Sequence, residues 1–166
     1  MSECIFAGSF DPWHNGHEDR VKNALKIFDK VHIVILKNES KKYWFDEIER
    51  VKLIERCISK FGDRVTVSCG GNKMLHDVCH EMQIFNVFRG IKAGRTFDEE
   101  IRLKIATNYF SKQEHDEEIL FVYDVTSEDD FRGSSIVKLL VLNNKDISSL
   151  VPIEIVDDIK EKANKL

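Results

Sequence analysis

Short apolar runs alternate along the chain with longer segments whose apolar residues recur every three or four positions. The short runs, rich in β-branched and aromatic residues, predict strands at residues 3–7, 31–36, 64–69, 85–88 and 119–123. The longer segments predict helices at about 16–28, 46–60, 73–82 and 96–112, with Val21, Leu25 and Phe28 showing the helical period in the first. This β-α-β-α order predicts an α/β fold with a doubly wound, parallel, five-stranded sheet and right-handed crossovers.

The 166 residues contain no internal repeat, linker or low-complexity segment, so we expect a single domain spanning 1–166. In a doubly wound sheet, ligands bind beyond the carboxyl ends of the strands, near the point where the strand order reverses. The segments that follow the predicted strands are 8–15, 37–45, 70–73, 89–96 and 124–134. The site residues are therefore expected in these loops.

The first of these loops has the features of a phosphate site. Residues 8–17 read Gly-Ser-Phe-Asp-Pro-Trp-His-Asn-Gly-His, directly after an apolar strand. Gly8 lets the chain turn, and a helix beginning near Asn15 would direct unpaired N–H groups toward an anion. His14 and His17 would lie on one face of its first turn. Two histidines alone also fit an ordinary surface corner, but the surrounding residues favour phosphate binding.

Three further loops offer phosphate-binding groups. The segment Ser40-Lys41-Lys42 can place a mobile ammonium, and Arg89, after an apolar strand, can grip phosphate with two parallel hydrogen bonds. Ser134 and Ser135 open a C-terminal helix, which Ser134 would cap and where both hydroxyls could bind a terminal phosphate. Each signal alone also fits a solvated loop, a surface ion pair or a helix cap. Their convergence on one edge of the sheet favours a shared anion site.

Composition and charge exclude several classes of protein. The net charge of −4 argues against broad, sequence-independent nucleic-acid binding, and no apolar run is long enough to span a membrane. No secretion signal is apparent at the start, so a cytoplasmic location is expected. The cysteines, Cys4, Cys57, Cys69 and Cys79, have no paired spacing, which predicts reduced thiols and no zinc site.

The segment at 8–17 resembles the T/HxGH signature of the nucleotidylyltransferase superfamily, and nearly the whole chain resembles the bacterial phosphopantetheine adenylyltransferase family. The matching segments are Gly8-Ser9-Phe10-Asp11-Pro12 through Asn15-Gly16-His17, Ser40-Lys41-Lys42, Phe45 with Glu49-Arg50-Val51, Arg89-Gly90, Phe97 to Glu100, Ser134 to Lys138, and Asp146-Ile147 with Leu150-Val151-Pro152. The resemblance implies a Rossmann-like nucleotidylyltransferase fold.

The resemblance also implies a reaction, in which AMP passes from ATP to 4′-phosphopantetheine and yields dephospho-coenzyme A and pyrophosphate in coenzyme A biosynthesis. The acceptor phosphate is itself the nucleophile, so in-line attack needs no covalent enzyme intermediate. Mg²⁺ is expected mainly on the oxygens of ATP, and the sequence shows no site formed by protein ligands alone. The family further implies a homo-oligomer, a hexamer.

For the chemical step, the resemblance implies particular roles. His17 would contact the ATP phosphates and stabilise charge as the bond to pyrophosphate breaks, and Ser9 would hold its hydroxyl near the reacting phosphates. Lys41 would orient the acceptor phosphate, and Arg89 would help to hold it. His14 occupies a position that is variable in the family and often threonine.

The remaining residues would bind one substrate or the other. The implied ATP site consists of Gly8, Ser9, His17, Lys92, Glu100, Ser134 and Ser135, with Glu100 near the ribose. The implied acceptor site consists of Ser9, Lys41, Met74, Leu75 and Arg89, with Met74 and Leu75 along the pantetheine arm. A Met-Leu pair at helical spacing also fits plain core.

Several positions depart from the family pattern. Thr96 replaces an acidic residue, Asp129 replaces an aromatic residue, and Lys92 replaces an arginine and lacks its planar fork. The fourth predicted helix is one residue longer, so Thr107 and Asn108 compete for the place of an asparagine that helps to bind the acceptor. These changes lie around substrate recognition, so adenylyl transfer is a firmer expectation than the acceptor.

Two other interpretations stay open. A nicotinamide-mononucleotide adenylyltransferase or a cytidylyltransferase would share the first motif, but it would have an RTEGIST-like or ISxTxIR-like late segment, whereas residues 132–138 are closer to SSSxVK. An inactive nucleotide-binding module would keep the fold and lose His17 or Lys41, and both are present.

Overall fold

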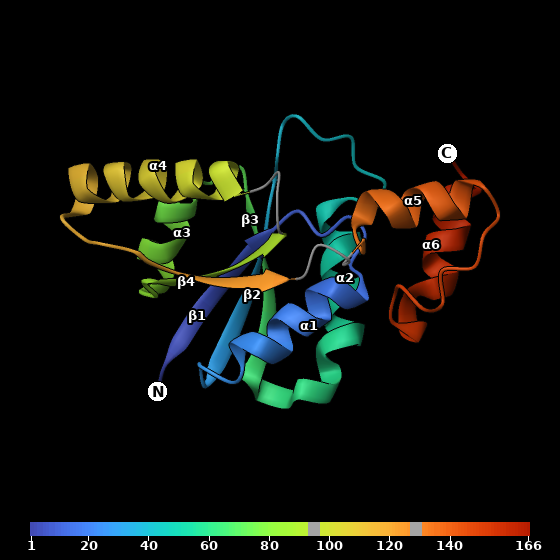
Figure 1. The fold of residues 1–166 in the computed structure, drawn as a ribbon, viewed down its shortest axis with the longest axis horizontal. Helices are drawn as coiled ribbons and strands as arrows, with labels where there is room; N and C mark the ends of the chain where they lie inside the picture. Colours follow the sequence, from blue (N-terminus) through green and yellow to red (C-terminus); the bar gives the residue numbers. More distant parts are fainter. Residues whose placement is uncertain (93–96, 127–130) are drawn as a thin grey trace.

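The computed structural model describes residues 1–92, 97–126 and 131–166, and for Lys92 and Thr126 it describes the backbone alone. Its centre is a sheet in the order β3-β2-β1-β4-β5 (Figure 1). The strands are β1 (Glu3–Gly8), β2 (Lys30–Leu36), β3 (Val65–Gly71), β4 (Asn86–Lys92) and β5 (Leu120–Thr126). Every neighbouring pair is parallel, which confirms the predicted fold class. The order reverses between β1 and β4, so ligands are expected beyond the carboxyl ends of these two strands.

Helices cover both faces of the sheet (Figure 1). On one face lie α1 (Asn15–Ala24), α2 (Glu47–Ile58), α5 (Ser134–Leu142) and α6 (Val156–Ala163), and on the other lie α3 (Leu75–Met82) and α4 (Phe97–His115). Each layer has its own apolar core. Trp13 and Ile54 are buried in the first, and Val78 and Ile119 in the second. Two 3₁₀ segments, Ser59–Arg64 and Ile153–Ile155, complete the described helices.

β4 and β5 extend further than the sequence predicts. They pair up to Lys92 opposite Thr126, well beyond the predicted ends. Arg89 and Gly90, which the sequence assigns to a loop, therefore lie inside β4. Arginine and glycine have little preference for strands, so the sequence pattern of the strand ends before Arg89. Hydrogen bonding to β5 nevertheless extends the strand beyond this point.

Two other elements differ from the sequence-based picture. β3 was expected to be buried on both faces, yet only Val65 is buried, because β3 lies at the edge of the sheet. The helix α6 was not predicted. Its buried residues, Val156 and Ile159, pack into the core of the α1–α2 face, but eight residues are too few to repeat the helical period along the sequence. Cys4, Cys57 and Cys79 are buried and Cys69 is exposed. Within the described residues, no helix is long and apolar enough to cross a membrane.

Candidate active site

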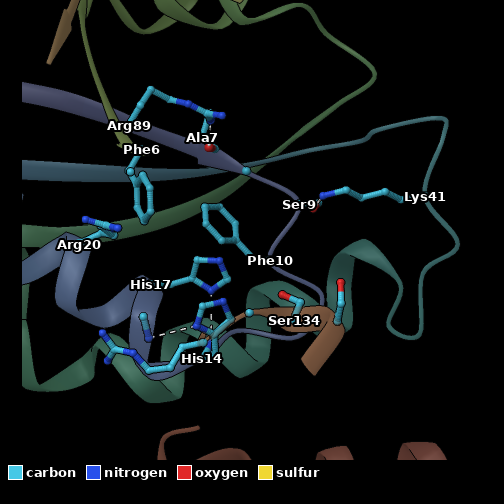
Figure 2. Close-up of a pocket in the computed structure, with 16 residues that line it drawn as sticks. Phe6, Ala7, Ser9, Phe10, His14, His17, Arg20, Lys41, Arg89 and Ser134 are labelled. Carbon is cyan, nitrogen blue, oxygen red and sulfur yellow. Dashed lines mark hydrogen bonds between the residues drawn. The ribbon is translucent and has the colours of Figure 1, made fainter. Parts of the chain in front are cut away.

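A cavity of about 300 Å³ lies where the strand order reverses. Its walls come from the loop after β1, the start of α1, the loop after β2, strand β4 and the start of α5 (Figure 2). Among the residues that line it are Gly8, Ser9, His17, Lys41, Arg89, Ser134 and Ser135, all of them expected from the sequence. Segments far apart in the chain thus place histidines, cations and hydroxyls around one space.

Two histidines build the amino terminus of α1. His14 is the N-cap residue, and its Nδ1 accepts a hydrogen bond from the Gly16 N–H at 3.0 Å. The Nδ1 of His17 accepts a hydrogen bond from the His14 N–H at 3.3 Å, and the two ring centroids are 3.7 Å apart (Figure 2). Because Nδ1 accepts in both rings, each neutral ring carries its proton at Nε2. In His17 this Nε2–H is a donor of the kind that a phosphate oxygen needs.

These bonds correct two expectations about α1. His14 precedes the helix as its cap and does not lie in the first turn. The first N–H groups of α1 are also occupied, since Asn15 donates to the Leu150 carbonyl at 2.8 Å and Gly16 donates to His14. The helix therefore contributes its positive dipole end to the cavity, while these two N–H groups already have partners inside the protein.

The amino terminus of α5 provides N–H groups instead. Its N-cap residue is Gly133, and no side chain in the described part of the chain caps it. The prediction that Ser134 caps this helix is wrong, because the Ser134 hydroxyl donates to the Pro12 carbonyl at 2.8 Å and ties α5 to the loop after β1. The first turn of α5, bordering the cavity at Ser134 and Ser135, is thus suited to an anion.

Lys41 reaches across the cavity to the loop after β1. Its Nζ donates a hydrogen bond to the Ser9 hydroxyl at 3.0 Å, and Figure 2 shows the side chain extended toward Ser9. The pKa of Lys41 is lowered, because partial removal from water disfavours the ammonium and because Arg89 and Lys138 are nearby cations. A bound anion would relieve this local excess of positive charge.

Arg89 projects from β4 and is held by an acidic side chain of α4. Its Nε and Nη2 donate to the two carboxylate oxygens of Glu100 at 2.7 and 2.6 Å, and its Nη1 donates to the Ala7 carbonyl at 2.6 Å. A guanidinium has N–H groups to spare after three such bonds, so Nη1 and Nη2 can still donate to a phosphate. Both Glu100 oxygens, which the resemblance assigns to the ATP ribose, accept from Arg89 in this structure.

Two buried residues without a role assigned from the sequence anchor the loops that hold Ser9 and Lys41. Asp11 accepts hydrogen bonds from the N–H groups of Trp44 and Phe45, both at 2.9 Å, and from the ammonium of Lys138. Arg50 is 2% exposed and donates to the Ser9 carbonyl at 2.6 Å. The sequence includes Asp11 and Arg50 in matching segments, but only the folded chain shows them as supports.

Arg20 is a further cavity residue that the sequence did not reveal. It is 7% exposed, lines the cavity from α1, and donates to the Asp124 carboxylate at 2.6 Å. Gly90 lies directly against it, since a Cβ at this position would stand 2.5 Å from the Arg20 Nε. On the sequence, Arg20 looks like any polar helix residue.

A second cavity of about 310 Å³ adjoins the first and shares Gly8, Ser9, Lys41 and Arg89 with it. Its other residues include Met74 and Leu75 of α3 and Leu103, Ala106 and Thr107 of α4. The structure thus brings together all the residues expected at the acceptor site.

Thr107 and Asn108 have different contacts in the structure. Thr107 is buried and lines the second cavity, whereas the Asn108 side chain pairs with the backbone N–H and carbonyl of Ile119 at 2.8 and 3.0 Å. Asn108 therefore fixes the start of β5. Of the other predicted or variant positions, the Lys92 side chain lies outside the described side chains, and Thr96 and Asp129 lie outside the described residues.

Sequence comparison relates the chain to one family of enzymes. The cytidylyltransferase-like family model matches residues 5–156. A phosphopantetheine adenylyltransferase of Campylobacter jejuni is 34% identical over 161 residues, covering 96% of this chain and 98% of the relative. The Clostridium perfringens protein of the same name is 32% identical and covers 100% and 98%.

Two solved structures share the fold at low sequence identity. A putative nicotinate-nucleotide adenylyltransferase from Vibrio parahaemolyticus superimposes with a TM-score of 0.64 at 17% identity, over 96% of this chain and 99% of the other. The Plasmodium falciparum nicotinic acid mononucleotide adenylyltransferase, complexed with NaAD, superimposes with a TM-score of 0.67 at 13% identity, over 99% and 95%.

Proposed function

This chain belongs to the phosphopantetheine adenylyltransferase family, and on that premise we propose that it transfers AMP from ATP to 4′-phosphopantetheine. The products are dephospho-coenzyme A and pyrophosphate. Membership of the family makes the protein a nucleotidyltransferase. The acceptor and the roles of individual residues are the part that we propose.

The observation that best supports the proposal is that Ser9, Lys41 and Arg89 border both cavities. The first cavity offers His17 and the start of α5, which suit a polyphosphate. The second has apolar walls such as Leu103, which suit a phosphate that carries a long, partly apolar arm. The two reacting phosphates would meet where the cavities join, beside Ser9 and Lys41.

In this arrangement the protein supplies position and charge. An oxygen of the acceptor phosphate attacks the α-phosphorus of ATP, and the bond to the β-phosphate breaks on the opposite side with its electron pair. Lys41 and Arg89 hold the attacking phosphate against the repulsion of ATP. His17 donates to the phosphates as charge shifts toward the leaving group, and the first turn of α5 receives the pyrophosphate. The attacking oxygen is already ionised, so no general base is required.

We infer that Mg²⁺ enters with ATP. No Asp or Glu is among the described residues that line the first cavity, and the neighbouring Asp11 and Glu100 carboxylates accept hydrogen bonds from other groups. Such a donor set does not fit an ion held by protein ligands, and it does fit an ion carried on phosphate oxygens and water. The ion then supplies neutralisation of phosphate charge.

A pyrophosphate-release assay tests the proposed reaction. The protein is incubated with ATP, Mg²⁺ and one acceptor at a time, with 4′-phosphopantetheine, nicotinamide mononucleotide, nicotinic acid mononucleotide, glycerol phosphate and no acceptor as the panel. We expect release with 4′-phosphopantetheine and a product with the mass of dephospho-coenzyme A. Release with a pyridine mononucleotide alone would support the alternative enzyme class, and no release with any acceptor would support an inactive module.

We further propose a homo-oligomer. Ile105 and Tyr109 are four residues apart on α4, and they are 63% and 60% exposed. Phe97, at the start of the same helix, is 51% exposed. Large apolar side chains aligned on one helix are typical of a subunit interface. The cytoplasmic location expected from the sequence stays a prediction.

A further inference from the structure

One end of the first cavity is formed by a buried charged pair. Arg20 is 7% exposed and lines the cavity from α1. Its Nη1 donates to the Asp124 Oδ2 at 2.6 Å and to the Asp124 carbonyl at 3.0 Å. The side-chain amide of Asn23 donates to the same Oδ2 at 3.0 Å. Contacts within the protein therefore fix both members of the pair before a substrate binds.

The Asp124 carboxylate stands beside a glycine of the cavity wall. Gly90 lines the cavity and is the register partner of Asp124 on the neighbouring strands β4 and β5. Because Gly90 has no side chain, the Arg20 guanidinium can lie against it. The Asp124 side chain is 19% exposed, and among the described residues both hydrogen bonds to its carboxylate go to Oδ2. Its Oδ1 can thus accept from a ligand that lies next to Arg20.

The nucleoside of ATP is the part of the substrates that would reach this pair. Figure 2 shows Arg20 on the other side of His17 from Ser9 and Lys41, where the reacting phosphates would meet. In-line transfer places the acceptor and the pyrophosphate on opposite sides of the α-phosphorus, so the nucleoside extends sideways from it. The acceptor side leads to the second cavity and the pyrophosphate side to the start of α5. The end at Arg20 is left for the nucleoside.

We propose that Arg20 and Asp124 recognise the base of ATP, an inference that rests on the AMP transfer proposed above. A guanidinium only donates and a carboxylate only accepts, so the pair presents a donor beside an acceptor. Adenine has the complementary arrangement, with an acceptor ring nitrogen beside its donor amino group, whereas guanine has two adjacent acceptors, N7 and O6. The pair therefore selects adenine over guanine. Neither residue lies in a segment that matches the family, so this contact belongs to the present chain.

The test compares nucleotides by calorimetry, with the full-length protein, Mg²⁺ and no acceptor. The panel is ATP, GTP, 1-deaza-ATP and 7-deaza-ATP, and each deaza compound lacks one of the two ring nitrogens beside the amino group. We expect the wild type to bind ATP about tenfold or more tightly than GTP and than one of the deaza compounds. This comparison needs no variant to fold. Equal dissociation constants for all four nucleotides would overturn the proposal.

Arg20→Met separates base recognition from a structural tie between α1 and β5. The variant lacks the donor, so ATP and the deaza compound that the wild type discriminates are expected to bind it within about twofold of each other. An arginine with only a structural role would lower the affinity for every nucleotide by the same factor. An unchanged ratio in a folded Arg20→Met protein would therefore overturn the proposal.

Asp124→Asn is expected to move the selectivity toward guanine. Arg20 and Asn23 both donate to Oδ2, so the new amide keeps its oxygen there and places its NH₂ at the position of Oδ1. Two donors would then face the base, which suits the adjacent acceptors of guanine. We expect the preference for ATP over GTP to fall by about tenfold. A preference equal to that of the wild type would contradict the proposed contact.

Arg56→Met is the matched control, because Arg56 pairs with Asp158 on the surface and lines neither cavity. It is expected to keep the wild-type ratios, and a change as large as in Arg20→Met would overturn the proposal. Because no acceptor is present, this result is separate from the pyrophosphate-release assay. Base selectivity without pyrophosphate release would refute only the AMP transfer, and release without base selectivity would refute only the base recognition.

Discussion

Arg89 and Glu100 are joined by two parallel hydrogen bonds, from Nε to Oε2 at 2.7 Å and from Nη2 to Oε1 at 2.6 Å. Paired in this way, the guanidinium has a fixed plane before any ligand arrives. Arg89 lines both cavities, and N–H groups remain on its Nη1 and Nη2 after these bonds and the one to Ala7. The phosphate binding that we propose for Arg89 would therefore depend on Glu100 as well.

Replacing Arg89 is expected to affect the acceptor selectively. For Arg89→Ala we expect kcat/KM for 4′-phosphopantetheine to fall by a factor that corresponds to about 2–4 kcal/mol of lost transition-state stabilisation. ATP affinity, measured by calorimetry, is expected to change far less. Arg89→Lys restores only part of the loss, because lysine lacks the fork that engages Glu100. A variant that loses ATP affinity and keeps its acceptor kinetics would show that Arg89 serves the nucleotide.

Glu100→Gln separates a positioning role from a nucleotide contact. A glutamine offers one acceptor oxygen and no charge, so Arg89 is held less firmly, and we expect KM for the acceptor to rise several-fold with a smaller change in the ATP dissociation constant. Glu99→Gln is the control, since Glu99 is the adjacent exposed carboxylate. If ATP affinity falls more than acceptor affinity, Glu100 contacts the ribose as the resemblance implies.

His17 and His14 are expected to differ in the chemical step. His17→Ala removes a donor to the shifting phosphate charge, so we expect kcat to fall by about 10²-fold or more with a smaller change in ATP affinity. His14→Thr keeps a side-chain oxygen that can cap α1 and should keep substantial activity. Circular dichroism of both variants checks that α1 is intact. Unchanged turnover in a folded His17→Ala protein would remove His17 from the reaction.

The lowered pKa of Lys41 makes a prediction about pH. Because its pKa in the fold lies below that in the unfolded chain, the charged ammonium destabilises the protein at neutral pH, and this destabilisation is relieved as the pH rises through the folded pKa. Lys41→Met is therefore expected to unfold at a higher temperature than the wild type at pH 7, with a smaller difference at high pH.

Ligand binding acts on the same titration in the opposite direction. A phosphate beside Lys41 stabilises the ammonium, so its pKa, followed by NMR of the lysine Cε, should rise when pyrophosphate or 4′-phosphopantetheine is added. Lys52, an exposed lysine of α2, serves as the internal reference. If neither anion changes the pKa of Lys41, the proposal that Lys41 contacts the substrate phosphates is contradicted.

The proposed subunit contact is tested by one charge on α4. Ile105→Asp puts a carboxylate on the exposed apolar row, and we expect sedimentation velocity to show a smaller species than the wild type. Lys104→Asp, one position away, is the control for charge alone. If Ile105→Asp has the same sedimentation coefficient as the wild type, the exposed apolar residues Ile105 and Tyr109 do not form the subunit interface.

The sequence predicted the sheet because its signal is local, whereas much of the site depends on contacts across the chain. Strand periodicity located β1 and β2 closely, and the loop after β1 pointed to His17. The pairing of Arg89 with Glu100 and the burial of Arg20 arise only when β4, α4 and α1 pack together. No spacing rule reports such distances.

The same limit applies to helix ends. Serine is a residue type that often caps helices, so Ser134 was a natural candidate. In the structure Gly133 is the N-cap residue of α5, and the Ser134 hydroxyl donates to the Pro12 carbonyl. The Ser134 hydroxyl thus connects α5 to the loop after β1 instead of capping its own helix. Among the described residues, no side chain caps the amino terminus of α5 as a result.

The close approach of Gly90 to Arg20 has a consequence for directed evolution. In a library that randomises positions 89 and 90 together, any side chain at the second position would require Arg20 to shift, because a Cβ there would lie 2.5 Å from the Arg20 Nε. Displacing Arg20 would also break its bond to Asp124. Selection for new acceptors is thus expected to retain glycine at position 90 while accepting changes at position 89, so diversity is better introduced along the apolar wall formed by Met74 and Leu103.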